Sequence, residues 1–397
     1  MKILLFKYTT LGYKDLYQSL VGMGHEVVYV EYVPKSYEED PYMEDLLMGR
    51  LSAESFDAVI SFNYFQVISK VCFCYRISYI AWVWDSPLLT LYSPTIYNDT
   101  NYIFIFDKIL YRSFKKQGIN TVFHLPLAVN HKRLEQMKID DWDLEKYTAD
   151  ISFVGRLYMK KISYDSMATL PDYCKGYIEA IMQAQTKIHG YNFLEEVLTE
   201  EVMKGICSRT EFYLGEKFTG SLRKVIADMF LGTKVTQLER TETLRNLAFH
   251  HVINLYTDES IDILPEVNHM GGVDYYDEMP KVFRLSKINL NITHRTIQSG
   301  IPLRIFDIMG AGGFVLTNYQ PEISELFSEG EELVVYYDTE DLLRKVEYYL
   351  IHEEERRKIA EAGCNKVRTF HNYEVRLNQM LQIVQERQQA GEGDVNQ

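Results

Sequence analysis

The amino-acid sequence predicts an α/β protein with two doubly wound domains. Short apolar runs of strand length alternate with helix-like patterns along most of the chain, and this alternation is typical of parallel sheets whose strands are joined by helices. The length of 397 residues and the hydrophobic content of 46% are sufficient for two separate cores. A polar, charged stretch at 141–147 interrupts the pattern, so we expect the domain boundary there.

The first domain is expected over residues 1–145, with its first helix at 13–23 and strands at 3–6, 27–30, 58–61, 79–83, 103–106 and 122–125. The second domain is expected over residues 146–372, with a helix-rich segment at 164–248 and strands at 151–154, 252–256, 288–292 and 314–317. Helices at 341–351 and 354–366 pair charges on one face, which indicates a scaffold role. A last helix is expected at 373–387, and the polar, apolar-poor residues 388–397 are expected to be disordered.

Residues 299–313 combine three features that a site for a nucleotide diphosphate requires. Gly300 shapes a loop after an apolar strand, and Arg304 falls in the first turn of the following helix. A cation there opposes the helix dipole, which an anionic ligand would rationalise. Asp307 lies on the same helix face as Arg304 and offers a carboxylate for ribose hydroxyls. The alternative is an ordinary surface ion pair between residues i and i+3.

A second cluster of glycine and basic residues follows the strand at 151–154. Gly155 and Arg156 come directly after it, and Lys160 and Lys161 follow. Ligands of open α/β sheets bind at the carboxyl ends of strands, and Arg156 and Lys161 would contact the two phosphates of a diphosphate from one side. For Lys160 and Lys161 a solvated loop is the alternative reading.

These segments, together with other motifs along almost the whole chain, resemble the CgeB-like proteins, which are spore-maturation and surface-glycosylation glycosyltransferases of bacteria within the GT-B group. The further motifs are WVWDSP at 82–87, FIFDK at 104–108, HLPLAVN at 124–130, SKINLNITHR at 286–295 and EERRKIAEAG at 354–363. The resemblance implies a GT-B fold, in which two Rossmann-like domains face each other across a cleft and the C-terminal helix crosses back to the N-terminal domain.

The resemblance also implies transfer of a hexose from a nucleoside-diphosphate sugar, with a UDP-sugar favoured, to a protein or surface-glycan acceptor. Retaining enzymes of the GT-B group have a Gly-Arg-Leu loop with a lysine five residues after the arginine, which matches Arg156 and Lys161. They also use two glutamates eight residues apart. The second matches Asp307, whereas the first falls on Ser299, so the chain departs from the pattern there.

Three further residues are candidates on the donor side. Arg295 would help to stabilise the departing diphosphate, and His294 beside it would contact a phosphate or a sugar hydroxyl, with a structural histidine as the alternative. Tyr275 lies in the loop GGVDYYDEM at 271–279. The resemblance places this loop over the nucleotide base, so Tyr275 is a candidate stacking residue, with ordinary packing as the alternative.

The candidates on the acceptor side follow strands of the first domain. Asp85 would act as a general base or orient the acceptor, or it would cap the turn at Ser86 and Pro87. Trp84 offers a face for a sugar, although the core is equally suitable for it. Asn63, after the strand at 58–61, is a further candidate.

Composition narrows the classes of partner. The chain has 42 Lys and Arg against 56 Asp and Glu, a net charge of −14, which argues against nucleic acid and against tight binding to an anionic membrane. Any anion site is therefore local. The only Asp-x-Asp spelling with charged neighbours, DWD at 141–143, reads as solvated linker. We therefore expect no metal and no cofactor, with the nucleotide sugar as a co-substrate.

The five cysteines, at 72, 74, 174, 207 and 364, have no paired spacing, so reduced thiols are expected. Met1 leads directly into a strand, and no apolar run reaches transmembrane length. We expect the protein to work in the cytoplasm. Glycosyl transfer is the leading hypothesis for its function. The alternatives are a GT-B sugar-nucleotide epimerase and a non-catalytic sugar-nucleotide-binding or spore-coat assembly protein.

Overall fold

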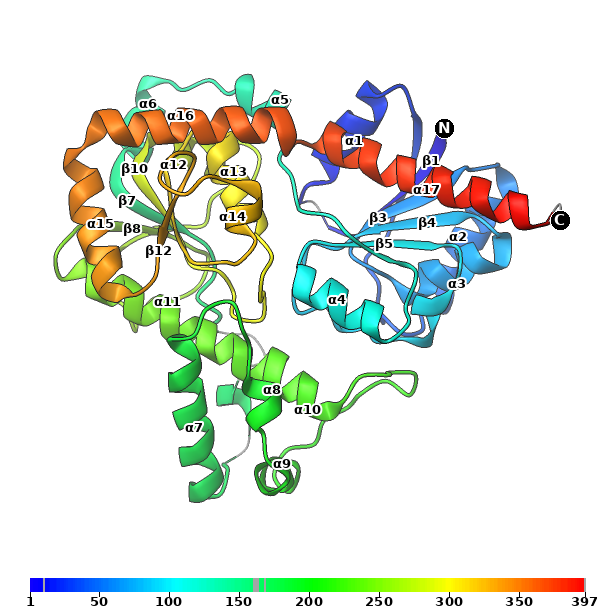
Figure 1. The fold of residues 1–397 in the computed structure, drawn as a ribbon, viewed down its shortest axis with the longest axis horizontal. Coiled ribbons are helices and arrows are strands. Elements are labelled where there is room, and N and C mark those ends of the chain that lie inside the picture. Colours follow the sequence, from blue (N-terminus) through cyan, green and yellow to red (C-terminus); the bar gives the residue numbers. More distant parts are fainter. Residues whose placement is uncertain (10, 160–163, 168, 396–397) are drawn as a thin grey trace. The chain divides into compact units, whose positions relative to one another are not determined.

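The computed structural model describes residues 1–9, 11–159, 164–167 and 169–395 (Figure 1). The chain divides into two compact units. The N-terminal unit comprises Met1–Asn130, Gly215–Gly220 and Phe370–Gln397, and the C-terminal unit comprises His131–Leu214 and Ser221–Thr369. The division therefore falls at residue 130, earlier than the expected boundary at 145.

Over its described residues, the N-terminal unit contains a six-stranded parallel sheet in the order β2-β1-β3-β4-β5-β6. Its strands are β1 (Lys2–Lys7), β2 (Glu26–Glu31), β3 (Ala58–Phe62), β4 (Ser78–Trp82), β5 (Asn101–Ile105) and β6 (Val122–His124). The helices around it are α1 (Tyr13–Gly22), α2 (Pro41–Ala53), α3 (Gln66–Tyr75) and α4 (Lys108–Lys116), with short 3₁₀ turns η1 (Leu89–Leu91) and η2 (Pro94–Tyr97). Strands β3, β4 and β5 are buried along their whole length, which explains why they are continuous apolar runs in the sequence.

The last helix, α17 (Tyr373–Val395), belongs to the N-terminal unit. The ring of Tyr373 packs edge-on against Trp82, with the centroids 5.3 Å apart, and the Arg376 Nε–H donates to the carbonyl of Pro126 at 2.8 Å. The return of the last helix to the first domain is thereby confirmed. The helix continues to Val395, so the disorder expected from residue 388 is wrong as far as residue 395. Gln388, Gln389 and Ala390, at the start of this stretch, are good helix formers.

Over its described residues, the C-terminal unit also contains a six-stranded parallel sheet, in the order β12-β11-β10-β7-β8-β9. Its strands are β7 (Ala149–Val154), β8 (Ile253–Tyr256), β9 (Asn268–Gly271), β10 (Ser286–Asn291), β11 (Val315–Asn318) and β12 (Val334–Tyr336). The helices that lie against this sheet or follow it are α5 (His131–Glu135), α6 (Asp141–Tyr147), α11 (Gly232–Ala248), α12 (Met279–Leu285), α13 (Leu303–Gly310), α14 (Ile323–Leu326), α15 (Thr339–Ile351) and α16 (Glu353–Phe370).

The helix-rich segment has a small core of its own. It contains η3 (Tyr164–Ser166), α7 (Asp172–Thr186), α8 (Leu194–Val197), α9 (Glu200–Cys207), α10 (Leu222–Val225) and the π-helical turn η4 (Ile226–Leu231). Ile178, Leu194, Val202 and Leu231 are buried in this cluster. Figure 1 shows α7, α8 and α9 grouped on the side of α11 that faces away from the sheet.

The stretch at 141–147, predicted to be a solvated linker, is helix α6 of the C-terminal unit. Asp140 and Asp143 form a capping box at its start. The carboxylate of Asp143 is almost fully buried and accepts from the Lys281 ammonium at 2.8 Å. The sequence shows only a charged stretch, because the lysine that pairs with Asp143 lies on α12, far along the chain.

Each sheet has a point where the chain leaves neighbouring strands in opposite directions. In the first sheet it lies between β1 and β3, and in the second between β7 and β10. Helices on the two sides of such a switch point cover opposite faces, which leaves a crevice at the carboxyl ends of the two strands. The predicted candidates Arg156, Arg304 and Asp307 all follow β7 or β10, so the topology places them around the switch point of the second sheet.

Candidate functional site

Two loops leave the second sheet at its switch point. Strands β7 and β10 pair in parallel, with Phe153 opposite Leu290. The chain after β7 runs through Gly155 to Met159, and the chain after β10 runs from Ile292 to the start of α13. Gly155 keeps the first loop on the sheet, because its N–H donates to the carbonyl of Tyr256 in β8 at 3.1 Å.

Arg240, on α11, joins the two loops. Its Nε–H and Nη2–H donate to the carbonyl of Ile292 at 3.1 and 2.6 Å, and its Nη1–H donates to the carbonyl of Arg156 at 2.5 Å. The guanidinium also lies over the rings of Phe153 and Tyr158, with 5.4 and 5.2 Å to the centroids. One buried cation thus fixes the backbone on both sides of the switch point.

Whereas Arg240 binds backbone carbonyls, Glu259 holds the loop after β7 through its backbone N–H groups. Its carboxylate accepts from the backbone N–H of Leu157, and from those of Tyr158 and Met159 at 3.0 Å each. Tyr158 has a positive φ of 62°, a conformation that is costly for a non-glycine residue and persists only where the surroundings fix it. The carboxylate and Arg240 together supply this constraint.

Arg156 is exposed, so its guanidinium is accessible from solvent, while its own carbonyl is held by Arg240. Lys161, the predicted second cation of this loop, lies outside the described residues.

Three of the predicted donor residues meet at α13. Arg304 lies 3.6 Å from Asp307 (Nη1 to Oδ2), and the Tyr275 hydroxyl donates to the other carboxylate oxygen of Asp307 at 3.2 Å. Arg304 also contacts the sulfur of Met279, and its guanidinium lies 5.5 Å from the centroid of the Phe283 ring.

Burial lowers the pKa of the Arg304 guanidinium, and the nearby positive charge of Arg240 adds to this, whereas Asp307 and the phenols of Tyr275 and Tyr158 oppose it. A cation that is desolvated in this way would gain from an additional anion. The i,i+3 pair that we considered as the alternative is therefore present, but it is part of a larger cluster at the switch point.

Arg295 is buried, and both terminal nitrogens of its guanidinium are engaged by the protein, whereas its Nε has no hydrogen-bond partner among the described residues. Its Nη2 lies 2.5 Å from Glu239 Oε1 and donates to the carbonyl of Thr186 at 2.8 Å, while its Nη1 donates to Ile188 and contacts His189. Only 4% of its side chain is exposed. This is the geometry of a structural ion pair rather than that of a phosphate ligand, and it ties the end of α7 and the residues after it to the loop after β10.

His294 is also buried. Its Nδ1 lies 2.8 Å from the Thr296 hydroxyl, and its ring meets Tyr158 edge-on with the centroids 5.1 Å apart. Gly300 is buried in the same loop, directly after Ser299. The Ser299 hydroxyl donates to the carboxylate of Glu322 at 2.7 Å, so a buried carboxylate from the loop after β11 reaches the position where the resemblance predicted a glutamate.

The acceptor-side candidates meet at the carboxyl ends of β3 and β4. Asn63 donates from Nδ2 to Asp85 Oδ2 and to the Tyr8 hydroxyl, both at 2.7 Å, and its Oδ1 accepts from the backbone N–H of Trp84 and Asp85 at 2.9 and 3.1 Å. Asn63 is buried and has a φ of 57°. The carboxylate of Asp85 is exposed and is therefore both oriented and accessible. Burial, with the Asp85 charge, raises the pKa of Tyr8, so Tyr8 remains a neutral partner.

The Trp84 indole packs against other side chains of the N-terminal unit rather than offering its face to a sugar. Its ring centroid lies 3.7 Å from that of Phe62 and 5.9 Å from that of Trp82. Gly12 lies against the indole so closely that a Cβ there would be 2.2 Å from it. This geometry favours the core role among the two that the sequence left open.

Arg240, Glu259 and Glu322 were not identified from the sequence. Arg240 stands in a helix of alternating polar and apolar residues with nothing to mark it, and Glu259 lies in the ordinary polar turn DES. Each acts on backbone groups or a hydroxyl from a distant segment, so no local pattern reveals it.

The described part of the chain shows neither a candidate metal centre nor a candidate membrane span. No group of three or more His, Cys, Asp or Glu side chains is arranged there to hold a metal ion. None of the helices there combines the length and the apolar character needed to cross a membrane.

Comparison with known proteins identifies the fold. Residues 235–382 match the family described as glycosyl transferase-like, whereas no curated protein sequence matches the chain. Among solved structures, a glycosyltransferase from Rickettsia africae aligns with a TM-score of 0.53 at 11% identity, covering 97% of this chain and 98% of that chain. Sucrose-phosphate synthase from Thermosynechococcus elongatus aligns with a TM-score of 0.54 at 10% identity, covering 98% and 100%.

HepE from Anabaena, solved with UDP-glucose, aligns with a TM-score of 0.55 at 10% identity, covering 97% of this chain and 100% of that chain. At such identities the similarity shows the fold alone. The two sheets and their flanking helices match these GT-B structures, so the predicted GT-B fold is confirmed.

Proposed function

We propose that this GT-B protein, with its glycosyl transferase-like region at 235–382, transfers a hexose from a nucleoside-diphosphate sugar to an acceptor hydroxyl without a metal ion. The donor is a UDP-sugar, and the acceptor is a protein or a surface glycan, in the manner of the CgeB-like proteins. The cytoplasm is the proposed compartment.

The observation that carries the proposal is the cationic cluster at the switch point of the second sheet. Arg304 is partly buried, with 28% of its side chain exposed, and only partly compensated by Asp307 at 3.6 Å, and Arg156 is exposed on the loop that Arg240 fixes. Preorganised cations of this kind stabilise the charge that develops on a diphosphate leaving group, and they need no reorganisation during the reaction. In a chain of net charge −14, such a local cluster is what an anionic donor requires.

The remaining donor residues complete the assignment. Asp307, oriented by Arg304 and the Tyr275 hydroxyl, would accept hydrogen bonds from ribose hydroxyls, and Tyr275 would lie near the base. The UDP in the HepE structures supports the choice of uridine. We assign Arg295 a structural role, because its Nη2 already donates to the Thr186 carbonyl and pairs with Glu239.

Asp85 is the proposed general base. As the acceptor oxygen attacks the anomeric carbon, its proton passes to the Asp85 carboxylate. The bond between the anomeric carbon and the diphosphate oxygen breaks, and the electron pair leaves with the diphosphate. Asn63 orients the carboxylate through its Nδ2–H, which is the kind of support that a general base requires.

The test uses isotope-labelled UDP-sugars and candidate acceptors, with UDP binding measured separately by calorimetry. For Arg304→Ala we expect UDP binding to weaken by roughly 10- to 100-fold, because a charge-assisted phosphate contact contributes about 1.5–3 kcal/mol. For Asp85→Asn we expect UDP binding to be unchanged and turnover to fall by about 10²- to 10⁴-fold. Arg245→Ala, on the exposed side of α11, is the matched control and should change neither quantity.

Each alternative function has its own outcome. Conversion of the donor sugar to an epimer without transfer would identify an epimerase, and UDP-sugar binding without any turnover would identify a binding or assembly protein. If Arg304→Ala bound UDP like the wild type, the donor site would be misassigned.

A further inference from the structure

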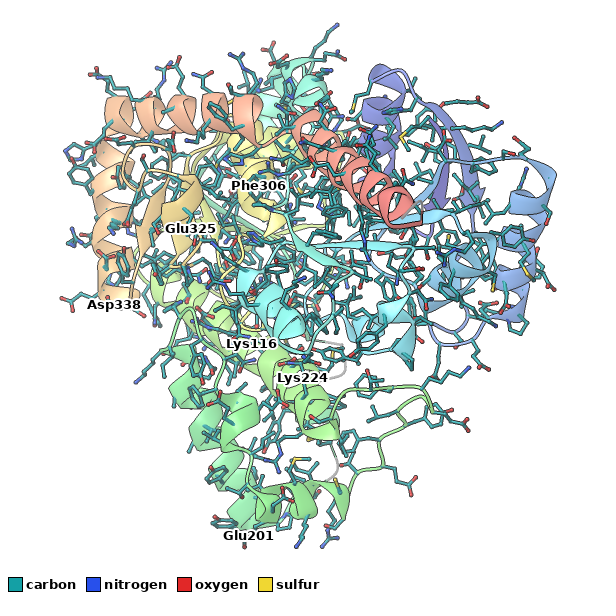
Figure 2. The ribbon with its side chains drawn as sticks, turned by 45° about the vertical axis from the view of Figure 1, so that its right-hand side comes forward. Lys116, Glu201, Lys224, Phe306, Glu325 and Asp338 are labelled. Atoms are coloured by element: carbon teal, nitrogen blue, oxygen red, sulfur yellow. The ribbon has the colours of Figure 1, made fainter. Side chains whose placement is uncertain are left out.

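A second pocket lies in the C-terminal unit, apart from the cationic cluster. Its volume is about 360 Å³, and its wall comes from the segment after α7, from α11 and from the junction of β12 and α15. Asp338 marks the start of α15 at its edge (Figure 2). Arg156, Arg304, Asp307 and Tyr275 do not line it, so it is not the site described above.

Two buried polar atoms in the residues of this wall have no hydrogen-bond partner. They are Oε2 of Glu239 and the hydroxyl of Tyr336, on side chains whose residues are 7% and 4% exposed. Buried polar groups in proteins are nearly always satisfied by protein, water or a ligand, and an unsatisfied one costs about 1–3 kcal/mol. Two such groups in one pocket wall point to a ligand that supplies hydroxyl or amino hydrogens.

The charges around the pocket exclude an anion. Glu242, Asp338 and Glu340 line it together with a single lysine, Lys187, and Arg295 is already paired with Glu239. His189, also in the wall, is neutral, because burial and then the neighbouring Arg295 charge lower its pKa to about 3. A diphosphate would be repelled by this set of carboxylates, whereas neutral hydroxyl groups would find acceptors in them.

The pocket also has an aromatic surface. Tyr337 lines it and is 50% exposed, and its ring is stacked on Tyr319 with the centroids 5.6 Å apart. Stacking on Tyr319 and the Lys345 ammonium, 5.4 Å from the ring centroid, hold the Tyr337 ring in place, and the exposed part of the ring offers apolar contact to the C–H groups of a ligand. Convergent polar atoms beside such a face, in a cavity of this size, are typical of small-molecule sites.

We propose that this pocket binds a neutral monosaccharide unit, whose hydroxyls donate to Oε2 of Glu239 and pair with the Tyr336 hydroxyl while its ring contacts Tyr337. This site is additional to the nucleotide-sugar site, and it does not depend on the proposed transfer reaction. Part of its wall, Thr186, Lys187 and His189, belongs to the helix-rich segment, so the segment contributes binding groups as well as bulk.

The test is ligand-observed NMR of the full chain with glucose, galactose and N-acetylglucosamine, each recorded with and without saturating UDP. We expect at least one of these sugars to bind in both conditions, because UDP occupies only the nucleotide site. Tyr336→Phe removes one hydroxyl and no packing, so the fold should persist, and we expect it to weaken that binding by roughly 3- to 10-fold. Tyr256→Phe is the matched control, since Tyr256 is a buried tyrosine at the end of β8 that does not line the pocket.

The outcomes separate this proposal from the proposed function. Sugar binding that is weakened by roughly 3- to 10-fold in Tyr336→Phe and retained in Arg304→Ala supports the pocket. Binding that is abolished by UDP or by Arg304→Ala belongs to the donor site and overturns it. Absence of binding by all three sugars, or binding of putrescine in their place, also overturns it, even where UDP binding and transfer are intact.

Discussion

Replacing Arg240 with methionine should loosen both loops of the candidate site at once. The guanidinium makes three N–H contacts to two carbonyls, those of Ile292 and Arg156. Hydrogen bonds from a charged donor contribute about 1.5–3 kcal/mol each, and an acceptor left unsatisfied costs about 1–3 kcal/mol. Methionine preserves most of the side-chain volume but satisfies neither carbonyl. We therefore expect a local destabilisation of about 3–5 kcal/mol for opening the two loops.

Hydrogen exchange of the full chain measures this local change without assuming that both units unfold together. At about 1.4 kcal/mol per factor of ten, the protection of backbone amides in residues 155–159 and 292–300 should fall by roughly 10²- to 10⁴-fold. UDP affinity should fall as well, since Arg156 and Arg304 would no longer be held in place. Amides in the N-terminal unit should exchange as in the wild type.

Arg245→Met is the matched control on the same helix. Its guanidinium donates one hydrogen bond, to the carbonyl of Ile263 at 2.7 Å, and its side chain is 38% exposed, so we expect an effect below about 1 kcal/mol. Wild-type protection at both loops in Arg240→Met would refute the reasoning. An equal loss of protection in Arg245→Met would do the same, because it would show a general effect of removing charge from α11.

Three further changes have defined outcomes. Hydrogen bonds from the Tyr147 hydroxyl and the Asp274 amide, together with Lys146, lower the pKa of Glu278 to about 2. The Glu278 carboxylate therefore stabilises the fold above its unfolded pKa near 4.5, and this stabilisation is lost as the pH falls towards 2. The free energies of urea unfolding of the wild type and of Glu278→Gln should accordingly differ at pH 7 and converge at acid pH. Gly313→Ala would place a Cβ 2.5 Å from the Phe283 carbonyl oxygen, and we expect it to lower the free energy of unfolding by about 1–3 kcal/mol. Gly49→Ala in α2, where a Cβ would have nothing within 4 Å, should raise the free energy of unfolding by up to about 1 kcal/mol. Thermal unfolding measures both, and the reverse order of stabilities would contradict the steric argument. Glu259→Gln leaves only one acceptor oxygen for the three backbone amides of residues 157–159, so the hydrogen-exchange rates of these amides should rise and UDP binding should weaken. Unchanged exchange rates would mean that Arg240 alone fixes the loop.

The sequence was a good guide to most strands of both sheets. All ten predicted strands are present, within a few residues of their expected bounds. Strands covered on both faces are apolar throughout, whereas the edge strand β2, in which only Val30 is buried, still forms an apolar run. Strand β9 was missed, since its four residues, NHMG, form no apolar run and are largely exposed at the edge of the sheet. Strand β12, with three residues at the opposite edge, is too short to show a period.

The site was predictable where it follows from chain order. Arg156, Arg304 and Asp307 stand just after predicted strands, and topology alone brings such positions to one edge of a parallel sheet. The contact of Tyr275 with Asp307 and that of Asn63 with Asp85 join residues that were proposed separately. The role of Arg295 was not predictable, because its partners lie on α11 and at the end of α7.

The sequence by itself determined most strands of the two sheets and the identity of the residues at the strand ends, because burial and chain order follow from local patterns of apolar and polar residues. The return of the last helix was implied by the resemblance to GT-B proteins and not by any local pattern. The tertiary structure decided which cations are left accessible to a ligand and which are paired with groups of the protein itself. In the sequence Arg295 is as good a donor candidate as Arg304, and nothing marks Arg240. The roles of Arg240 and Arg295 depend on carbonyls and carboxylates that folding brings to them from distant segments, and a buried guanidinium is committed to those partners by the cost of leaving them unpaired.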